Sequence, residues 1–276
     1  MKKSPMDFCA DFTELTELTG LASARKLAML ALAAYDDPVS FSGYSMQQLR
    51  DEKTSTRAVC GLAATHAVIV FPGTEDASDI LTDLEIGLKL WKDVNTSHAP
   101  PAEFHSGFLD CMTGAVCAWL DGLLPTLRHD KITRVDVVGH SLGGALAQLA
   151  SLYLALLGLK GVECTTFGSP RVGNDVAARL ASGAPFGLRN FMAREDPVVM
   201  LPPQSFGYWR WGAGVGADMR PGRQVNIVLP NATYVSPSDT WSVNLLNLAQ
   251  HHMQHYVDLI NTHEASTLSD HAFVVK

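Results

Sequence analysis

Residues 133–158 read as a strand, a sharp turn and a helix, with a serine at the turn. The stretch 135–138 is rich in valine, which suits a buried strand, and 145–157 is rich in alanine and leucine, which favour a helix. The turn between them, Gly139-His140-Ser141-Leu142-Gly143, fits the pattern G-x-S-x-G. In such a turn the glycines let the backbone bend tightly and lift the serine Oγ clear of the sheet. The free N–H groups of the following helix would face an anion formed there, so this segment predicts a serine nucleophile.

The whole chain has the size and composition of one globular domain. It has 276 residues, of which 47% are hydrophobic and 18% charged. We expect a single domain over 1–276, with its core at about 21–262. The net charge is −7 and no lysine or arginine cluster exceeds two neighbours, so nucleic acid is not an expected partner. The cysteines are odd in number and lack C-x-x-C spacing, which predicts buried thiols rather than disulfides or a zinc site; they are Cys9, Cys60, Cys111, Cys117 and Cys164.

The N-terminus does not have the pattern of a signal peptide. Lys2 and Lys3 resemble the start of one, but acidic residues between 7 and 17 interrupt any apolar run. No stretch approaches 18 consecutive apolar residues. We therefore expect no Sec leader and no transmembrane segment, and a chain that is cytoplasmic or exported by a leaderless route.

Strands and helices are expected to alternate along most of the chain. Helices are predicted at 21–36, 104–128 and 249–262, and a short one at "NDVAARLAS" capped by Asn174. Besides the strand before Ser141, strands are predicted at 56–62, 66–71, 187–194, 224–229 and in "VECTTFGSP". This order predicts an α/β fold, with a mostly parallel central sheet and helices on both faces.

A serine nucleophile needs a histidine base, and the base needs an orienting carboxylate. In α/β-hydrolase-like sheets these groups follow in the order Ser, Asp or Glu, His. The chain has no histidine between 141 and 250. The candidates for the base are therefore His251, His252, His255, His263 and His271.

Asp196 is the best placed carboxylate, because it follows directly after the predicted strand at 187–194. Functional groups of α/β sheets gather at the carboxyl ends of their strands. The other candidates have simpler explanations in capping, solvation or strand alternation; they are Asp175, Asp218, Asp258 and Glu195.

A metal site is the alternative use of the histidines. His251 and His255 stand four residues apart and could bind a metal from one helix face. Zinc hydrolases with such a pair usually carry a Glu between the histidines, and this segment has none. We expect no metal and no cofactor.

The sequence resembles the class 3 lipases, the fungal-type triacylglycerol lipase family, from about residue 58 to 260. The resemblance depends on six motifs in order: "FPGTEDASDILTDL", "HSGF", "GHSLGGALA", "TFGSPRVGN", "DPVVMLPPQSFGY" and "HHMQHY". It implies an α/β-hydrolase fold, with Ser141 as nucleophile and Asp196 as the acid of the triad. The spacing to Met253 and Tyr256 favours His251 as the base, whereas a shorter spacing found in other members would select His252.

The resemblance also implies an oxyanion hole and a lid. Thr74 would supply one half of the hole, and the backbone N–H of Leu142 the other. The chain departs from the family at Pro72, where arginine is usual, which puts the anchoring of this loop in doubt. The lid candidate is 75–92, where apolar residues at helical spacing could equally be core; they are Ile80, Leu84, Leu88 and Trp91.

Three aromatic residues follow in "FGYWRWGAGVG": Tyr208, Trp209 and Trp211. They either fill a gap in the core or line an acyl pocket and a lipid–water interface. Together these features predict a serine hydrolase that cleaves acylglycerol esters through an acyl-enzyme, with transient contact to a lipid–water interface. The alternatives are a short-chain carboxylesterase, a phospholipase A, and a catalytically inactive binding scaffold on the same fold.

Overall fold

Seven strands form one central sheet in the order β1-β2-β3-β6-β7-β8-β9. The computed structural model describes residues 20–74, 87–94, 100–193, 196–212, 222–229 and 248–265. The strands are β1 (Ser45–Asp51), β2 (Thr56–Leu62), β3 (His66–Phe71), β6 (Arg134–His140), β7 (Val162–Phe167), β8 (Gly187–Ala193) and β9 (Gln224–Leu229). The first three pair antiparallel, and every pair from β3 to β9 is parallel. The prediction of a mostly parallel sheet is confirmed.

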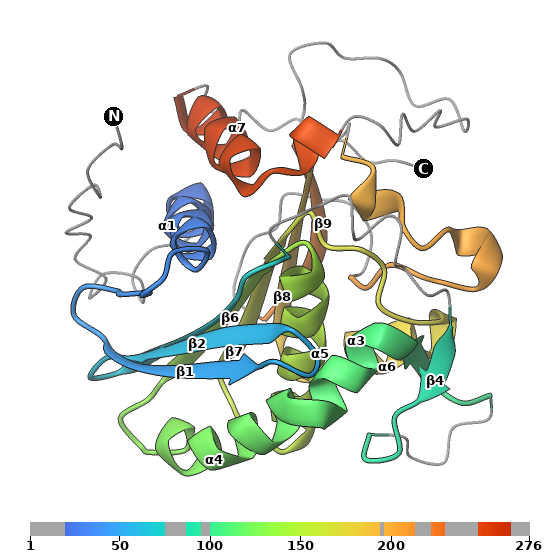
Figure 1. Ribbon diagram of the computed structural model, residues 1–276, viewed down its shortest axis with the longest axis horizontal. Coiled ribbons are helices and arrows are strands. Elements are labelled where there is room, and N and C mark those ends of the chain that lie inside the picture. Colours follow the sequence, from blue (N-terminus) through green and yellow to red (C-terminus); the bar gives the residue numbers. More distant parts are fainter. Residues whose placement is uncertain are drawn as a thin grey trace.

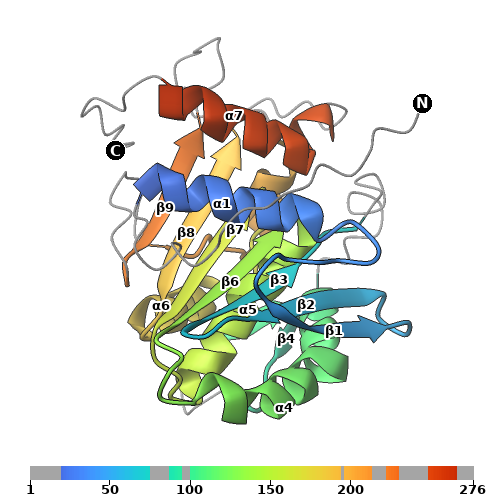
Figure 2. The same cartoon turned by 90° about the vertical axis from the view of Figure 1, so that its left-hand side faces the viewer.

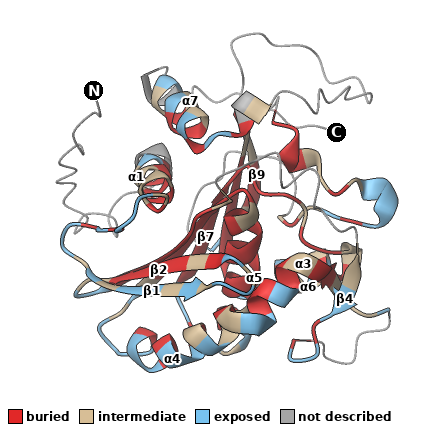
Figure 3. Cartoon of the chain, viewed as in Figure 1, coloured by how far each residue is buried: buried red, intermediate tan, exposed pale blue. Residues whose placement is uncertain are grey.

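Helices cover both faces of this sheet (Figures 1 and 2). On one face α1 (Gly20–Ala33) and α7 (Met253–Ala265) lie side by side. On the other lie α5 (Leu142–Leu156), α6 (Asp175–Gly183) and a continuous helical run made of α3 (Ser106–Cys111), η2 (Met112–Val116) and α4 (Cys117–Leu127). Short 3₁₀ turns are η3 (Val198–Met200), η4 (Gln204–Phe206) and η5 (Leu248–His251). Buried side chains fill both layers between sheet and helices, and α5 is buried along most of its length (Figure 3).

The edge strand β1 was not predicted. It pairs with β2 along its whole length, from Ser45 opposite Leu62 to Asp51 opposite Thr56. Its sequence, SMQQLRD, is polar and none of its residues is fully buried. An exposed edge strand need not alternate apolar and polar residues, so periodicity gives no signal there.

The described end of the lid candidate, 87–92, is not helical, and Trp91 fits the alternative of a core residue. Leu88 lies in a short strand, β4 (Leu88–Leu90), which pairs with β5 (Glu103–His105). Trp91 is buried and stacks on Tyr153, with ring centroids 5.8 Å apart. Strand pairing and the burial of a large aromatic ring override the helical spacing of these residues. Ile80 and Leu84 belong to 75–86, outside the described residues.

One helical run, Ser106–Leu127, meets the length and composition test for a membrane span among the described residues. It has 22 residues and a mean hydropathy of 1.3. Core helices pass the same test, and the run buries Met112, Leu120 and Leu123 in the core shared with α5. We interpret it as a core helix of the domain.

The cysteines that the structure describes are free thiols, as predicted. Cys60, Cys111 and Cys164 are buried and Cys117 is partly buried. Burial raises the pKa of the Cys60, Cys117 and Cys164 thiols to about 12. They remain protonated near neutral pH and serve as small apolar side chains. Cys9 lies outside the described residues.

Candidate active site

Ser141 stands on a strained turn between β6 and α5. Its φ is +58° and its ψ −129°, a conformation that costs a non-glycine residue energy. A Cβ on Gly139 would lie 2.1 Å from the carbonyl oxygen of Gly143, and a Cβ on Gly143 would lie 2.1 Å from that of Phe71. Both glycines are therefore required, the first within the turn and the second against the end of β3. The turn has the geometry predicted for a nucleophile elbow.

The predicted oxyanion residues lie at the same edge of the sheet as Ser141. Thr74 follows β3 by three residues, and a Cβ on the neighbouring Gly73 would lie 2.8 Å from the Cβ of Ser141. Leu142 is the first residue of α5, and the N–H groups of a first helical turn lack helical partners. The structure thus brings the loop after β3 against the elbow.

Asp196 and His251 are hydrogen-bonded to each other beside this turn. The Nδ1 of His251 lies 2.8 Å from Oδ2 of Asp196 and 3.0 Å from Oδ1. A carboxylate accepts, so Nδ1 donates and the lone pair of the imidazole is on Nε2. Ser141, Asp196 and His251 are each 1% exposed. Within the described residues, neither Nε2 of His251 nor Oγ of Ser141 has a hydrogen-bond partner.

Two further donors fix the Asp196 carboxylate. The hydroxyl of Tyr256 donates to Oδ2 at 2.6 Å, and the N–H of Val198 donates to Oδ1 at 2.8 Å. Tyr256 also accepts from the N–H of Ala193 at 3.0 Å. Burial and the nearby Asp196 charge raise the pKa of Tyr256 well above its usual value, so its hydroxyl stays a donor. In the sequence Tyr256 served to set the spacing of the histidine segment, and its hydrogen bond to Asp196 was not predicted.

Gly168 makes room for the acid and the base. Its φ is +61°, and a Cβ there would lie 2.8 Å from Oδ2 of Asp196 and 3.1 Å from the ring of His251. Glycine is thus required both by backbone conformation and by space. The "TFGSP" segment was noted for its strand, and its glycine was the signal that could have revealed this close approach.

Two partly buried arginines, Arg171 and Arg210, hold the segment that follows Asp196. Arg210 donates to the carbonyl oxygens of Ser169, at 3.1 Å, and Val199. Arg171 donates to those of Met200 and Pro202. Burial, followed by the charge of Arg171, lowers the pKa of Arg210 to about 9, while the negative charge of Asp196 opposes that shift. The two guanidinium groups tie the turn after Asp196 to the end of β7.

Among the described histidine candidates, His251 is the one that bonds to Asp196. His251 ends the 3₁₀ turn η5, and α7 begins only at Met253, so the predicted single helix over 249–262 is wrong at this point. His252 is exposed and His255 is partly buried against the ring of Tyr256. The side chain of His263 and all of His271 lie outside the described part of the chain.

The other acidic candidates are explained by their surroundings. Asp175 forms an exposed ion pair with Arg179 at the start of α6. The cap of that helix is Asn174, whose side chain accepts from the N–H of Ala177, as predicted. Asp258 accepts from Gln254 on the exposed side of α7. Asp218 and Glu195 lie outside the described residues.

The aromatic residues of the predicted pocket divide into two kinds. Tyr208 and Trp211 are buried in the core, and Tyr208 donates to the carbonyl oxygen of Gly87 at 2.9 Å. Trp209 is 47% exposed, and Phe206 beside it 56%. The first two fill the core, and the latter two form an apolar surface.

A serine elbow on a mostly parallel sheet, followed by an Asp and a His at the carboxyl ends of the strands, defines an α/β-hydrolase. Residues 68–206 match the family described as Lipase (class 3). Because this match covers half of the chain, the chain belongs to the class 3 lipase family.

Fungal lipases are among its relatives. The chain is 32% identical over 144 residues to a lipase of Rhizopus oryzae and 33% identical over 165 residues to secreted mono- and diacylglycerol lipase 2 of Gibberella zeae. Each match covers 51% of this chain, and 36% and 40% of the respective relatives. Lipase II from Rhizopus niveus has a similar structure, with a TM-score of 0.60, 23% identity and coverage of 78% of this chain and 84% of that one. Rhizomucor miehei triacylglyceride lipase has a TM-score of 0.56 at 24% identity, covering 70% and 78%. These structures establish the α/β-hydrolase fold.

Proposed function

We propose that this chain hydrolyses acylglycerol esters through a Ser141–His251–Asp196 triad and an acyl-enzyme. The observation that carries the proposal is the His251–Asp196 pair. Its orientation leaves Nε2 of a buried imidazole as the free acceptor beside the elbow. Membership of the class 3 lipases and the names of the relatives, which include a mono- and diacylglycerol lipase, support the substrate class.

The proposed reaction has two halves. Oγ of Ser141 attacks the ester carbonyl carbon while Nε2 of His251 takes its proton, and the carbonyl oxygen becomes an oxyanion. The intermediate collapses, the C–O bond to the alcohol breaks, and His251 returns the proton to the leaving oxygen. Water, deprotonated by His251, then attacks the acyl carbon, the bond from that carbon to Oγ of Ser141 breaks, and His251 returns the proton to Oγ as the fatty acid leaves. Asp196 holds the imidazole through its hydrogen bond to Nδ1 and stabilises the imidazolium.

The oxyanion would be held by the N–H of Leu142, the N–H and hydroxyl of Thr74, and the dipole of α5. A donor of this kind typically contributes about 10²–10³ in kcat. The position of Thr74 after β3 and of Leu142 at the start of α5 supports this assignment.

Contact with a lipid–water interface is supported by exposed apolar side chains near the short sheet β4–β5. These residues are Leu90 on β4, and Phe206 and Trp209 on the loop beside it. The loop lies against β4, because a Cβ on Gly207 would approach the side chain of Leu88 within 3.9 Å. Exposed aromatic residues favour the boundary between water and lipid.

A substrate panel tests the proposal. It contains soluble esters of increasing acyl length, mono-, di- and triacylglycerol emulsions and phosphatidylcholine vesicles, with Ser141→Ala as the inactive control. We expect hydrolysis of acylglycerols, with a rate that rises once the substrate exceeds its solubility limit.

Other outcomes would identify the alternatives. Activity confined to short soluble esters would indicate a carboxylesterase, and a preference for vesicles a phospholipase A. A chain that hydrolyses none of these substrates and is not labelled by an organophosphonate probe would be a binding scaffold, and the proposal would be wrong.

A further inference from the structure

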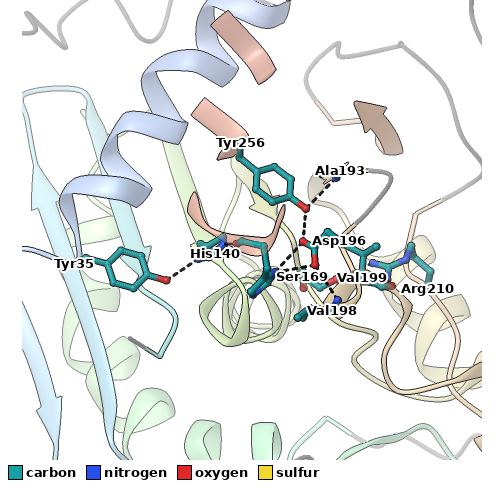
Figure 4. Close-up of polar contacts among 10 residues, drawn as sticks. Tyr35, His140, Ser169, Ala193, Asp196, Val198, Val199, Arg210 and Tyr256 are labelled. Carbon is teal, nitrogen blue, oxygen red and sulfur yellow. Dashed lines mark hydrogen bonds and ion pairs between the residues drawn. The ribbon is translucent and has the colours of Figure 1, made fainter. Parts of the chain in front are cut away.

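A chain of three hydrogen bonds, two partly buried and one fully buried, connects the loop after β3 with His251. The N–H of Gly73 donates to the hydroxyl of Tyr35 at 2.8 Å. The Tyr35 hydroxyl lies 2.6 Å from Nδ1 of His140 (Figure 4). Nε2 of His140 lies 2.7 Å from the carbonyl oxygen of His251. The links therefore join the residue before Thr74, the residue before Ser141 and the backbone of the proposed base.

The chemistry of the end groups sets the direction of every bond. A carbonyl oxygen only accepts, so Nε2 of His140 must carry the proton and Nδ1 must accept. The Tyr35 hydroxyl then donates its proton to Nδ1 and uses a lone pair for the N–H of Gly73. Burial, followed by the nearby His251, lowers the pKa of His140 well below its usual value. His140 therefore stays neutral near neutral pH, and its hydrogen bonds select the tautomer with the proton on Nε2.

Packing reinforces the same connection. The rings of His140 and His251 stack, with centroids 4.8 Å apart and planes at 28°. A Cβ on Gly73 would lie 2.6 Å from the Tyr35 hydroxyl and 2.8 Å from the Cβ of Ser141. The Tyr35 hydroxyl thus reaches the point where the loop after β3 meets the elbow.

We propose that Tyr35 and His140 are positioning residues, which together hold the imidazole of His251 and the Gly73–Thr74 loop in the geometry for acyl transfer. His140 supports His251 by donating a hydrogen bond to the backbone carbonyl of His251 and by stacking on its ring. Tyr35 extends this support to the Gly73–Thr74 loop through its hydrogen bond with Gly73. The inference depends on the proposed function, because it assigns roles toward Ser141 and His251. A displacement of reacting groups by about 1 Å can reduce a rate 10²-fold, so the network would act on kcat.

The chain contains a matched control for this role. Tyr44 and His66 form a second Tyr–His pair, with a hydroxyl-to-Nδ1 distance of 2.7 Å and ring centroids 5.9 Å apart, as in the Tyr35–His140 pair. His66 begins β3 and binds Asp136, so this pair lies at the opposite end of the strand from Thr74. The substitution of Tyr by Phe removes the same kind of hydrogen bond at both places.

The test measures kcat and KM on a soluble ester, and the rate of organophosphonate labelling, for the full chain. We expect Tyr35→Phe to lower kcat and the labelling rate about 10- to 100-fold with KM within threefold, and Tyr44→Phe to leave all three within twofold. His140→Gln keeps an amide donor for the His251 carbonyl and should retain more activity than His140→Leu. Adding Tyr35→Phe to His140→Leu should cost little more, because both substitutions break one network.

Four results would overturn the inference: a normal kcat in Tyr35→Phe, an equal loss in Tyr44→Phe, an effect confined to KM, or additive losses. Should Tyr35→Phe not fold, the comparison of His140→Gln with His140→Leu decides in the same way. A wild-type chain that neither hydrolyses esters nor reacts with the probe would overturn the proposed function, and the inference with it.

Discussion

At the scale of single residues, the position of His251 just before α7 decides which histidine can act. His251 ends η5, whereas His252 points to solvent and His255 belongs to the following helix. We expect His251→Ala to lose activity to the level of Ser141→Ala, and His252→Ala and His255→Ala to keep at least a tenth of it. Steady-state kinetics on a soluble ester measure this.

The double variant Ser141→Ala/His251→Ala provides the check, because members of a triad act as a unit. It should be no worse than either single variant. If His252→Ala is the inactive variant instead, the shorter spacing to Tyr256 is the correct one and the base has been misassigned by one residue.

Asp196 is the residue at which loss of charge should matter most. It accepts from His251, Tyr256 and Val198, whereas an asparagine has one acceptor oxygen and presents N–H groups to these donors. Asp196→Asn should lower kcat about 10⁴-fold, since the imidazole is no longer held in the productive tautomer. Kinetics of Asp196→Asn and Glu195→Gln test this, and near-normal kcat in the first with a loss in the second would move the assignment to Glu195.

At the scale of secondary-structure elements, the position directly after β7, Gly168, must lack a side chain. In Gly168→Ala the new Cβ meets the Asp196 carboxylate and the His251 ring, and we expect kcat to fall at least about 10²-fold. Gly158→Ala is the control, because Gly158 also has a positive φ, +82°, but nothing within 4 Å of its Cβ position. It should cost about 1 kcal/mol of stability and leave kcat unchanged. Equal effects on kcat at both positions would show that backbone strain, not crowding, is responsible.

The elements that the sequence predicts well are those with a one-sided or wholly apolar pattern. β3, β9 and the β6–α5 elbow match their predicted positions because short runs of mostly apolar, β-branched residues indicate buried strands and an alanine- and leucine-rich run indicates a buried helix. The structures of β1 and of the Leu88–Trp91 segment were not predicted correctly. β1 is an exposed edge strand without an apolar pattern, and the conformation of Leu88–Trp91 is determined by its pairing with β5 and the burial of Trp91. The triad candidates could be predicted from residue type and order along the chain. The roles of Tyr35 and His140 could not, because they depend on contacts between residues more than 100 positions apart. The role of Gly168 depends on the space that its missing Cβ leaves for Asp196 and His251.

At the scale of the whole molecule, the two ends of the sheet carry similar clusters with different hydrogen bonding. At the amino ends of β3 and β6, His66 binds Tyr44 and Asp136, and both carboxylate oxygens of Asp136 also accept from Arg134. Both ring nitrogens of His66 are engaged. At the carboxyl ends, His251 has Nε2 free of partners among the described residues. An imidazole nitrogen without a partner among the described residues, rather than the Tyr–His–Asp composition, distinguishes the proposed active-site end from the other end.

The stability of the whole molecule should fall in mild acid, and His105 provides a measurable part of this effect. Its ring is buried, stacks on Phe108 with centroids 4.0 Å apart, and accepts from the N–H of Phe108 at the start of α3. Burial lowers the pKa of His105 to about 4, from 6.5 for an unperturbed histidine. Between these two values the unfolded chain binds more protons than the folded chain. The free energy of unfolding therefore rises with pH across this window and is level above it.

We expect His105 to contribute a loss of about 2 kcal/mol as the pH falls from 7 to 4.5, at about 1.4 kcal/mol for each pH unit within the window. His105→Asn removes the titrating ring, and the amide oxygen of the asparagine can still cap α3. The free energy of unfolding of this variant should therefore fall by about 2 kcal/mol less than that of the wild type between pH 7 and 4.5. His129→Asn is the control, because the side chain of His129 is exposed. Urea unfolding at a series of pH values measures the difference. Equal pH dependence in wild type and His105→Asn would show that His105 does not titrate between pH 4 and 6.5 on unfolding.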